Sequence, residues 1–250
     1  MLFQRRYKGA LQMPEFTVVK VLAAIFTPDF NISNSLKIAN TAFNLMGDRL
    51  DGEPTILPIP QDAPADIPRV TLQSSDNLLS LSVAPSRTNL VFSIPLELVV
   101  DIIDYSSYYS NMSKFLVEFS AELDLNIQRL GYVTDRLIIA DNALSSILDR
   151  FCNKDQIIKG RPFYNPKRFE IHSLKKYDWE GFQLNSWVRL KFLPIKSKDE
   201  KIKPALLVQN DLNTLSYEED PGASFNAEDI KKYFDNIPSH LKKVLNLYFE

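Results

Sequence analysis

The sequence is poor in the residues that most catalytic and metal sites use. Its 250 residues include one cysteine, two histidines and seven glycines. The lone Cys152 cannot form an intramolecular disulfide, and one cysteine with two histidines does not make a Cys/His zinc site. The glycine-rich loops that bind dinucleotides and nucleoside triphosphates do not occur, and neither does the G-x-S-x-G turn of the α/β-hydrolases. We therefore expect a protein without cofactor or metal, and binding rather than catalysis.

Long apolar runs and a strong charge of one sign are also missing. No stretch of about 18 residues is free of charge, so the sequence predicts no transmembrane helix. Arg5, Arg6 and Lys8 interrupt the first twelve residues, which differs from a signal peptide. A formal net charge of -2 gives no general attraction to nucleic acid or to anionic lipid. These observations predict a cytoplasmic protein without a membrane partner.

Strands and helices alternate along the first half of the predicted fold. The almost continuously apolar run Phe16–Phe26 is typical of a central strand buried on both faces. A helix capped by Ser33 or Ser35 follows, and the five prolines of residues 52–68 then predict an extended connector. Such a connector could serve as a polyproline ligand, but a semi-rigid loop across one end of a sheet is the simpler interpretation.

Period-two alternation begins at Arg69 and continues to Ile94, which predicts a meander of three antiparallel strands. A helix from Pro95 to about Tyr105 and a long aromatic helix follow. The aromatic stripe Tyr108–Phe119 has the spacing of a core-facing helix, although it could also line a ligand cavity. A strand over about residues 126–139 and a helix capped by Asp141 complete this half.

The second half predicts another meander and two closing helices. Three strand-like runs lie between Lys167 and Leu212. Asn226 then caps one helix, and Pro238 starts another. Together the elements predict an α+β fold in which antiparallel meanders are covered by helices. We expect residues 1–250 to form a single compact unit, with two related sub-lobes, 14–151 and 165–250, joined by a basic loop.

Two arginines lie in the strand predicted over residues 126–139. Arg129 and Arg136 are seven residues apart, so they point to opposite faces and cannot form one bidentate clamp. A buried guanidinium needs a matching group. We therefore expect Arg129 to form a structural ion pair with a carboxylate, and Arg136 to pair locally with an acidic residue or to reach solvent.

Acidic and basic clusters are the remaining candidates for a site. Asp211 with Glu218, Glu219 and Asp220 could hold Mg²⁺, but the last three are more typical of a solvated turn. The basic and aromatic cluster over residues 154–176 could follow phosphates, contact an acidic protein, or be a solvated loop. Its candidate binding residues are Lys159, Arg161, Tyr164, Lys167, Arg168, Lys175 and Lys176.

The order of segments resembles that of a sporadically distributed, uncharacterised prokaryotic protein family of about 250 residues. The segments that carry this resemblance are "VVKVLAAIF", the proline-rich connector, "YYSNMSKFLVEFSAEL", "IQRLGYV" and "PALLVQNDLNTLS". A central Arg-x-Gly strand is matched by Arg129 and Gly131, and a late acidic strand by Asp211. The family often continues Arg-Tyr-x-Asn after the glycine, whereas this chain continues Tyr132-Val133-Thr134-Asp135. The resemblance implies an accessory, partner-binding role near mobile or defence loci and supplies no catalytic residue.

The sequence thus predicts a non-catalytic binding protein that engages a protein partner through an exposed edge or groove, with self-association into a homodimer or larger homo-oligomer. A nucleic-acid-binding or nucleic-acid-processing protein that uses the 154–176 cluster is the alternative. A receptor for a small ligand, with the aromatic helix lining its cavity, is the third hypothesis.

Overall fold

The computed structural model describes residues 16–28, 30–60, 62–95, 109–153, 155, 158–162, 164–196 and 200–249. Its strands are β1 (Thr17–Phe26), β2 (Thr55–Ile56), β3 (Val70–Gln73), β4 (Leu79–Ala84), β5 (Arg87–Ser93), β6 (Arg129–Ile139), β7 (Phe169–Trp179), β8 (Phe182–Lys196) and β9 (Ile202–Thr214). Its helices are α1 (Ser35–Met46), α3 (Met112–Glu122), α4 (Ala143–Phe151) and α5 (Ala227–Phe249). This mixture of helices and strands confirms the predicted α+β class.

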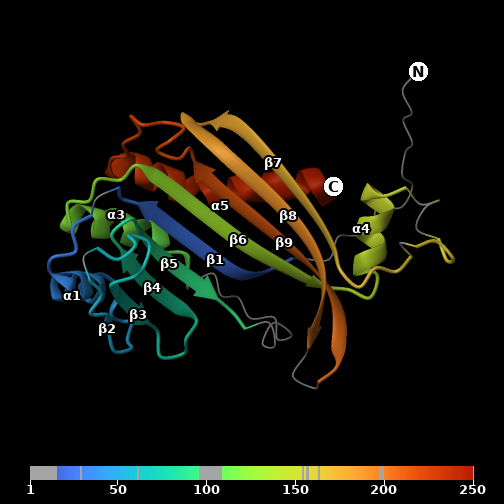
Figure 1. Ribbon diagram of the computed structural model, residues 1–250, viewed down its shortest axis with the longest axis horizontal. Helices are drawn as coiled ribbons and strands as arrows, with labels where there is room; N and C mark the ends of the chain where they lie inside the picture. Colours follow the sequence, from blue (N-terminus) through green and yellow to red (C-terminus); the bar gives the residue numbers. More distant parts are fainter. Residues whose placement is uncertain are drawn as a thin grey trace.

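All nine strands belong to one antiparallel sheet, in the order β2-β3-β4-β5-β1-β6-β9-β8-β7. Both predicted meanders are present, as β3-β4-β5 on one side of the central pair β1-β6 and as β9-β8-β7 on the other (Figure 1). The position of β1 in the middle of the sheet confirms that it is a central strand. The strand β7 forms one edge of the sheet, and the two-residue β2 forms the other.

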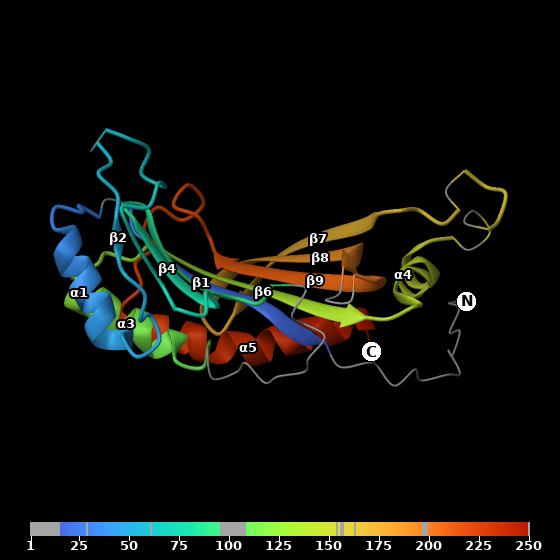
Figure 2. The same cartoon turned by 90° about the horizontal axis from the view of Figure 1, so that it is seen from below.

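Helices lie on one side of this sheet. Figure 2 shows α1, α3 and α5 along the same face, while α4 lies beyond the end of β6. The main core includes Val21 and Ile25 of β1, Phe119 of α3 and Tyr233 of α5, which meet between that face and the helices. The Tyr233 hydroxyl donates a 2.8 Å hydrogen bond to the Leu212 carbonyl, which fastens α5 to β9.

The opposite face of the sheet, which we call the open face, has no helix on it in the described part of the chain. Its residues in β1 are Lys20, Leu22, Ala24 and Phe26, and three of these four are only partly buried. The prediction that β1 is buried on both faces is therefore wrong. A continuous apolar run cannot distinguish a strand with two covered faces from one whose second face carries half-exposed apolar side chains.

Several helix ends differ from the prediction. The cap of α1 is Asn34, whose side chain accepts a 2.9 Å hydrogen bond from the Lys37 amide, rather than Ser33 or Ser35. The residue before α4 is Asn142 rather than Asp141. These errors of one or two residues are typical where several cap-forming side chains are adjacent.

The last two predicted helices are a single helix, α5, with Pro238 in its interior. The predicted cap at Asn226 is correct, because its side chain accepts hydrogen bonds from the Glu228 and Asp229 amides at 2.8 and 3.0 Å. A proline removes only one helical hydrogen bond. Burial of Ile237 and Leu241 on either side of Pro238 keeps the helix continuous against the core.

The helix predicted from Pro95 to Tyr105 lies outside the described residues, apart from its first residue.

Arg136 lies on the helix-covered face of β6 and is 8% exposed. Its Nη1 donates to Thr134 Oγ1 at 2.7 Å and to Asn210 Oδ1 at 2.9 Å, and no carboxylate among the described residues pairs with it. The prediction that Arg136 pairs with an acidic residue or reaches solvent is therefore wrong. Burial lowers the pKa of this guanidinium below its ordinary value. The Nδ2 of Asn210 is buried without a hydrogen-bond partner in the described structure. The Arg136 guanidinium is therefore a buried cation whose hydrogen-bond acceptors in this cluster, Thr134 and Asn210, are both neutral.

We predict that Asn210→Leu lowers the free energy of unfolding by about 2–4 kcal/mol, because it leaves a buried guanidinium short of an acceptor. Combining it with Arg136→Met should recover most of that loss, since apolar groups then replace both partners. Urea unfolding of the two single variants and the double variant measures the coupling. Equal and additive losses at the two positions would contradict this account of the cluster.

Candidate functional site: the β7 edge and the open face

The turn between β7 and β8 fixes which backbone groups of β7 are free. Glu180 and Gly181 have φ values of 50° and 91°, and they join the paired residues Trp179 and Phe182. Two positive φ values in a two-residue hairpin are those of a type I′ turn, which closes with a hydrogen bond between the residues that flank it. Trp179 and Phe182 are therefore a hydrogen-bonded pair. Glycine suits the second position because it adopts positive φ without strain.

From this pair the orientation alternates along the whole strand, because β7 and β8 keep one register without a bulge from Phe169 to Trp179. In an antiparallel pair, every second residue directs its N–H and C=O toward the partner strand, and the residues between direct theirs away. The odd-numbered residues of β7 thus bond to β8. The residues whose backbone N–H and C=O point away from the sheet are Glu170, His172, Leu174, Lys176 and Asp178.

The side chains of these five residues lie on the open face. Tyr177, between two of them, lies on the other face, where its hydroxyl is 2.7 Å from His240 Nε2 of α5. The His240 ring also packs on Trp179, with ring centroids 4.7 Å apart. Burial lowers the pKa of His240, which favours the neutral ring at this contact. These contacts hold the end of β7 against α5 on the helix-covered face of the sheet.

A chain of polar side chains crosses the open face next to β7. Gln209 of β9 donates to Asp135 of β6 at 2.8 Å and accepts from Arg189 of β8 at 3.0 Å. Arg189 also forms a 3.1 Å ion pair with Asp211, and its guanidinium lies 5.0 Å from the centroid of the Trp187 ring. Because each member is held by another, the network fixes the side chains of three neighbouring strands.

Gly131 gives this network the space it needs. A Cβ atom at this position would lie 2.7 Å from the Asn213 side-chain oxygen and 3.2 Å from the Phe26 ring. Asn213 in turn donates to Asp211. The glycine of the Arg-x-Gly pair is therefore required by close packing on the open face rather than by a turn.

Arg129 and Arg136 lie on opposite faces of β6, as predicted from their spacing. The Arg129 guanidinium lies 5.0 Å from the centroid of the Phe26 ring on the neighbouring strand, and its Nε has no hydrogen-bond partner in the described structure. The contact is a cation–π stack. A structural ion pair of Arg129 with a carboxylate stays a prediction.

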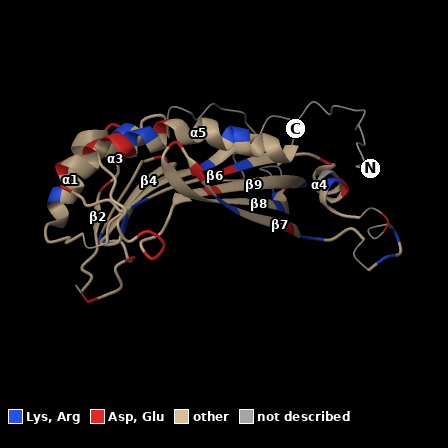
Figure 3. Ribbon diagram, turned by 90° about the horizontal axis from the view of Figure 1, so that it is seen from above, with Lys and Arg blue, Asp and Glu red and all other residues tan. Residues whose placement is uncertain are grey.

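The predicted basic cluster is spread over three places. Lys159, Arg161, Tyr164, Lys167 and Arg168 are exposed on the loop between α4 and β7, at the end of the molecule away from α1 (Figures 2 and 3). Lys175 lies on the helix-covered side of β7, with its ammonium 5.7 Å from the centroid of the Tyr177 ring. Lys176 lies on the open face, where it pairs with Glu219. Lys154 and Phe163 lie outside the described residues.

Glu219 holds the loop after β9 against the open face. Its carboxylate accepts from Lys176, from Asn185 Nδ2 at 3.0 Å, and from the Ser216 amide and hydroxyl at 3.1 Å each. The Lys176 bond is the largest of the interactions that lower the pKa of Glu219 to about 2. The predicted acidic group is thus divided, because Glu219 pairs with Lys176 while Asp211 pairs with Arg189. No group of three potential metal ligands occurs among the described residues.

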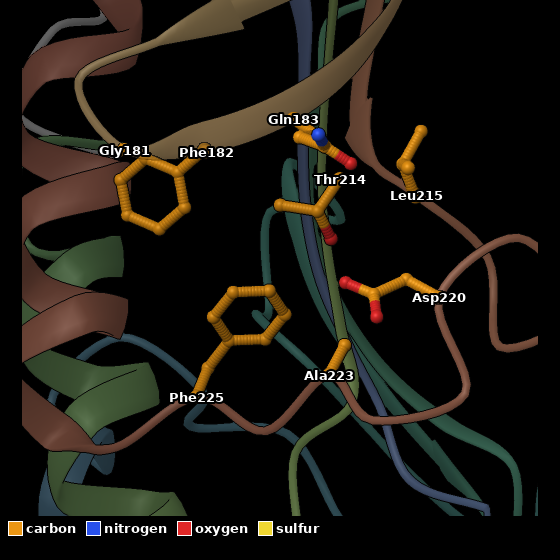
Figure 4. A pocket seen from close by; sticks show the side chains of 8 residues that line it. All are labelled: Gly181, Phe182, Gln183, Thr214, Leu215, Asp220, Ala223 and Phe225. Carbon is orange, nitrogen blue, oxygen red and sulfur yellow. The ribbon is translucent and has the colours of Figure 1, made fainter.

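A cavity of about 400 Å³ lies beside this loop, at the β7-β8 turn. Figure 4 shows the rings of Phe182 and Phe225 on one side of it and the polar side chains of Gln183, Thr214 and Asp220 on the other. The aromatic helix α3 does not line this cavity, and its Phe115 and Phe119 are buried in the core. In the described part of that helix, the regularly spaced aromatic residues therefore pack in the core.

Comparison with known proteins assigns no class to the chain. No family model matches it, and no curated protein matches it. The resemblance inferred from segment order therefore stays a prediction. Among the described helices, none has both the length and the apolar character that crossing a bilayer requires. The function has to be argued from the geometry of the β7 edge and the open face.

We predict that the contribution of Glu219 to stability disappears in acid. A carboxylate whose folded-state pKa is lowered stabilises the fold above its ordinary pKa of 4.5, and this stabilisation is lost as the pH falls toward 2. Thermal unfolding of the wild type and of Glu219→Gln, measured across this range, should show a difference that is constant above pH 4.5 and vanishes near pH 2. A difference that persists unchanged into acid would rule out this role.

Proposed function

We propose that the chain is a non-catalytic protein-binding module that accepts an extended segment of its partner along β7. The observation that carries this proposal is that β7 is an eleven-residue edge strand in which every second residue directs its backbone N–H and C=O away from the sheet. Such a row of donors and acceptors is the template to which an extended peptide adds as another strand. The backbone bonds supply affinity, and the side chains beside them supply specificity.

The other edge of the sheet, formed by β2, differs from β7 in a way that supports this proposal. There β2 has two residues and continues into the proline-rich connector, which Arg69 pins by a 2.8 Å bond to the Ile67 carbonyl. Arg69 also bonds the Pro60 and Ala63 carbonyls at 3.4 and 3.3 Å. Short edges and prolines are the usual means of preventing strand addition. We infer that one edge is closed to partners and the other is kept open.

The order of elements is similar in the two halves of the chain. Among the described elements, a strand, a helix, a meander and another helix occur in β1-α1-β3-β4-β5-α3, apart from the two-residue β2, and they occur again in β6-α4-β7-β8-β9-α5. In both, the last meander strand lies beside the strand that opened the half. This repetition supports two related sub-lobes that share one sheet. In that interpretation each sub-lobe contributes one outer edge, and only the second sub-lobe has a long one.

Side chains around the edge suit a selective contact. Leu174 is 45% exposed at the centre of the strand, and it is paired across the sheet with Trp187. An incoming strand would place its own side chains beside Leu174, while the charges of Glu170 and Lys176 on either side disfavour unselective pairing. The fixed network around Arg189 lowers the entropy cost of presenting this surface.

Proline substitutions at adjacent positions test the proposal. Leu174→Pro removes an outward N–H without removing a bond to β8, so we expect the fold to remain and binding to be lost. Leu174→Ala keeps the outward N–H and is the matched control. Ser173→Pro removes a bond within the sheet and should lower the melting temperature much more than Leu174→Pro.

The readout is affinity capture from cells with quantitative mass spectrometry. Proteins retained by the wild type and by Leu174→Ala but lost with Leu174→Pro would depend on the β7 edge. Circular dichroism and thermal melting confirm that each variant is folded. If a folded Leu174→Pro protein retains the same partners as the wild type, strand addition at β7 is not the mode of binding.

Binding of nucleic acid by the 154–176 cluster is the second candidate function. Five of its residues are exposed together on the loop between α4 and β7, where they could contact phosphates without a change of fold. Lys167→Glu with Arg168→Glu should then weaken binding to single-stranded DNA or RNA and reduce its dependence on salt concentration. Fluorescence anisotropy measures both effects. Equal affinities for the wild type and the variant would remove this function.

A further inference from the structure

We infer that the partner added at β7 is a second copy of this chain, in a register centred on Ser173. The inference rests on the proposed function, because it uses the same edge, and it goes further by naming the occupant. Two copies would form one continuous sheet across a two-fold axis perpendicular to it. The open face of one copy would continue into that of the other, and so would the face covered by helices.

The backbone limits which registers are allowed. Outward N–H and C=O groups belong to the even-numbered residues of β7, so even-numbered residues of one copy must meet even-numbered residues of the other. In a symmetric antiparallel pair the two position numbers then add to a constant even number, and the axis passes through one residue of each copy. The central candidates for that residue are His172, Ser173, Leu174 and Lys175.

Charge selects among these registers. With the axis at Leu174, Glu170 would face Asp178. With the axis at His172, Arg168, the loop residue directly before β7, would face Lys176. With the axis at Lys175 that ammonium would face its own copy. Like charges directly opposite each other destabilise a strand pair. Each of these three registers therefore contains a repulsive contact.

The register centred on Ser173 has no such contact. Within β7 it places Glu170 opposite Lys176, and at the end of the strand it places Arg168, the residue directly before β7, opposite Asp178. The two-fold axis repeats each pair. All four side chains are exposed in the single chain. On the helix-covered face the same register places Phe169 opposite Tyr177, an aromatic pair across the strands. When two antiparallel copies of β7 are paired about Ser173, opposite charges and aromatic rings therefore face each other.

Lys176 can take part without releasing the loop after β9. Its ammonium carries three donors, and within the chain it bonds to Glu219. Glu170 is 3.2 Å from His172 Nε2, an exposed contact that a lysine across the interface can replace or join.

Pairing of two edges buries less surface than the roughly 1,200–2,000 Å² of stable interfaces, so we expect a dimer that dissociates on dilution.

Complementary charge reversals test the register. Glu170→Lys alone would place two lysines opposite each other at both ends of the interface, and Lys176→Glu alone would place two glutamates there. Each variant should raise the dimer dissociation constant by about tenfold or more. Mixing the two variants restores opposite charges at both ends, so a heterodimer should form. Glu122→Lys, an exposed charge reversal on α3, is the matched control and should dimerise like the wild type.

Sedimentation velocity over a wide concentration range measures the wild type and the single variants, and native mass spectrometry identifies the heterodimer in the mixture. Loss in both single variants with recovery on mixing is the expected result. A wild type that stays monomeric throughout overturns self-pairing, as does a dimer that neither variant weakens. Failure to recover on mixing overturns the Ser173 register. Binding of a different protein that Leu174→Pro abolishes would then leave the proposed function standing without this partner.

Discussion

An open β-sheet must end in two edge strands, and the backbone groups along each edge must bond to something or remain exposed to water. In this molecule that requirement is met differently at the two ends. The short β2 and the connector pinned by Arg69 occupy one end, whereas β7 leaves a long row of outward groups at the other. The surfaces available to a partner follow from this asymmetry.

The helices add a second asymmetry, because they lie on one face only (Figure 2). On the helix-covered face, the polar contact between the Tyr177 hydroxyl and His240 of α5 holds β7 beside the apolar core. On the opposite face, the polar pairs such as Arg189 with Asp211 are partly exposed and contribute less. Next to β7 the open face is therefore ordered by hydrogen bonds, whereas toward the end of β6 it also carries the buried apolar side chains of Leu137 and Ala205. An edge supported in this way can present its backbone groups without reorganising.

The α+β class and both meanders could be predicted, because period-two alternation such as Leu79, Leu81 and Val83 is a local signal. The opposite faces of Arg129 and Arg136 follow from the same period. The free edge could not be predicted, because it depends on β9 returning beside β6 rather than beside β1. The network across the open face joins Asp135 to Gln209, which are 74 residues apart. No spacing rule relates such positions before the strands are paired.

The most direct test of this account is the amide exchange of β7, measured residue by residue by NMR. At low protein concentration the amides of His172, Leu174 and Lys176 should exchange rapidly, while those of Ser173 and Tyr177 should be protected by β8. Protection of the even-numbered amides should appear when the partner is added or the concentration is raised. Equal protection of neighbouring even and odd amides in the dilute protein would show that the outer edge of β7 is already occupied, which contradicts the account.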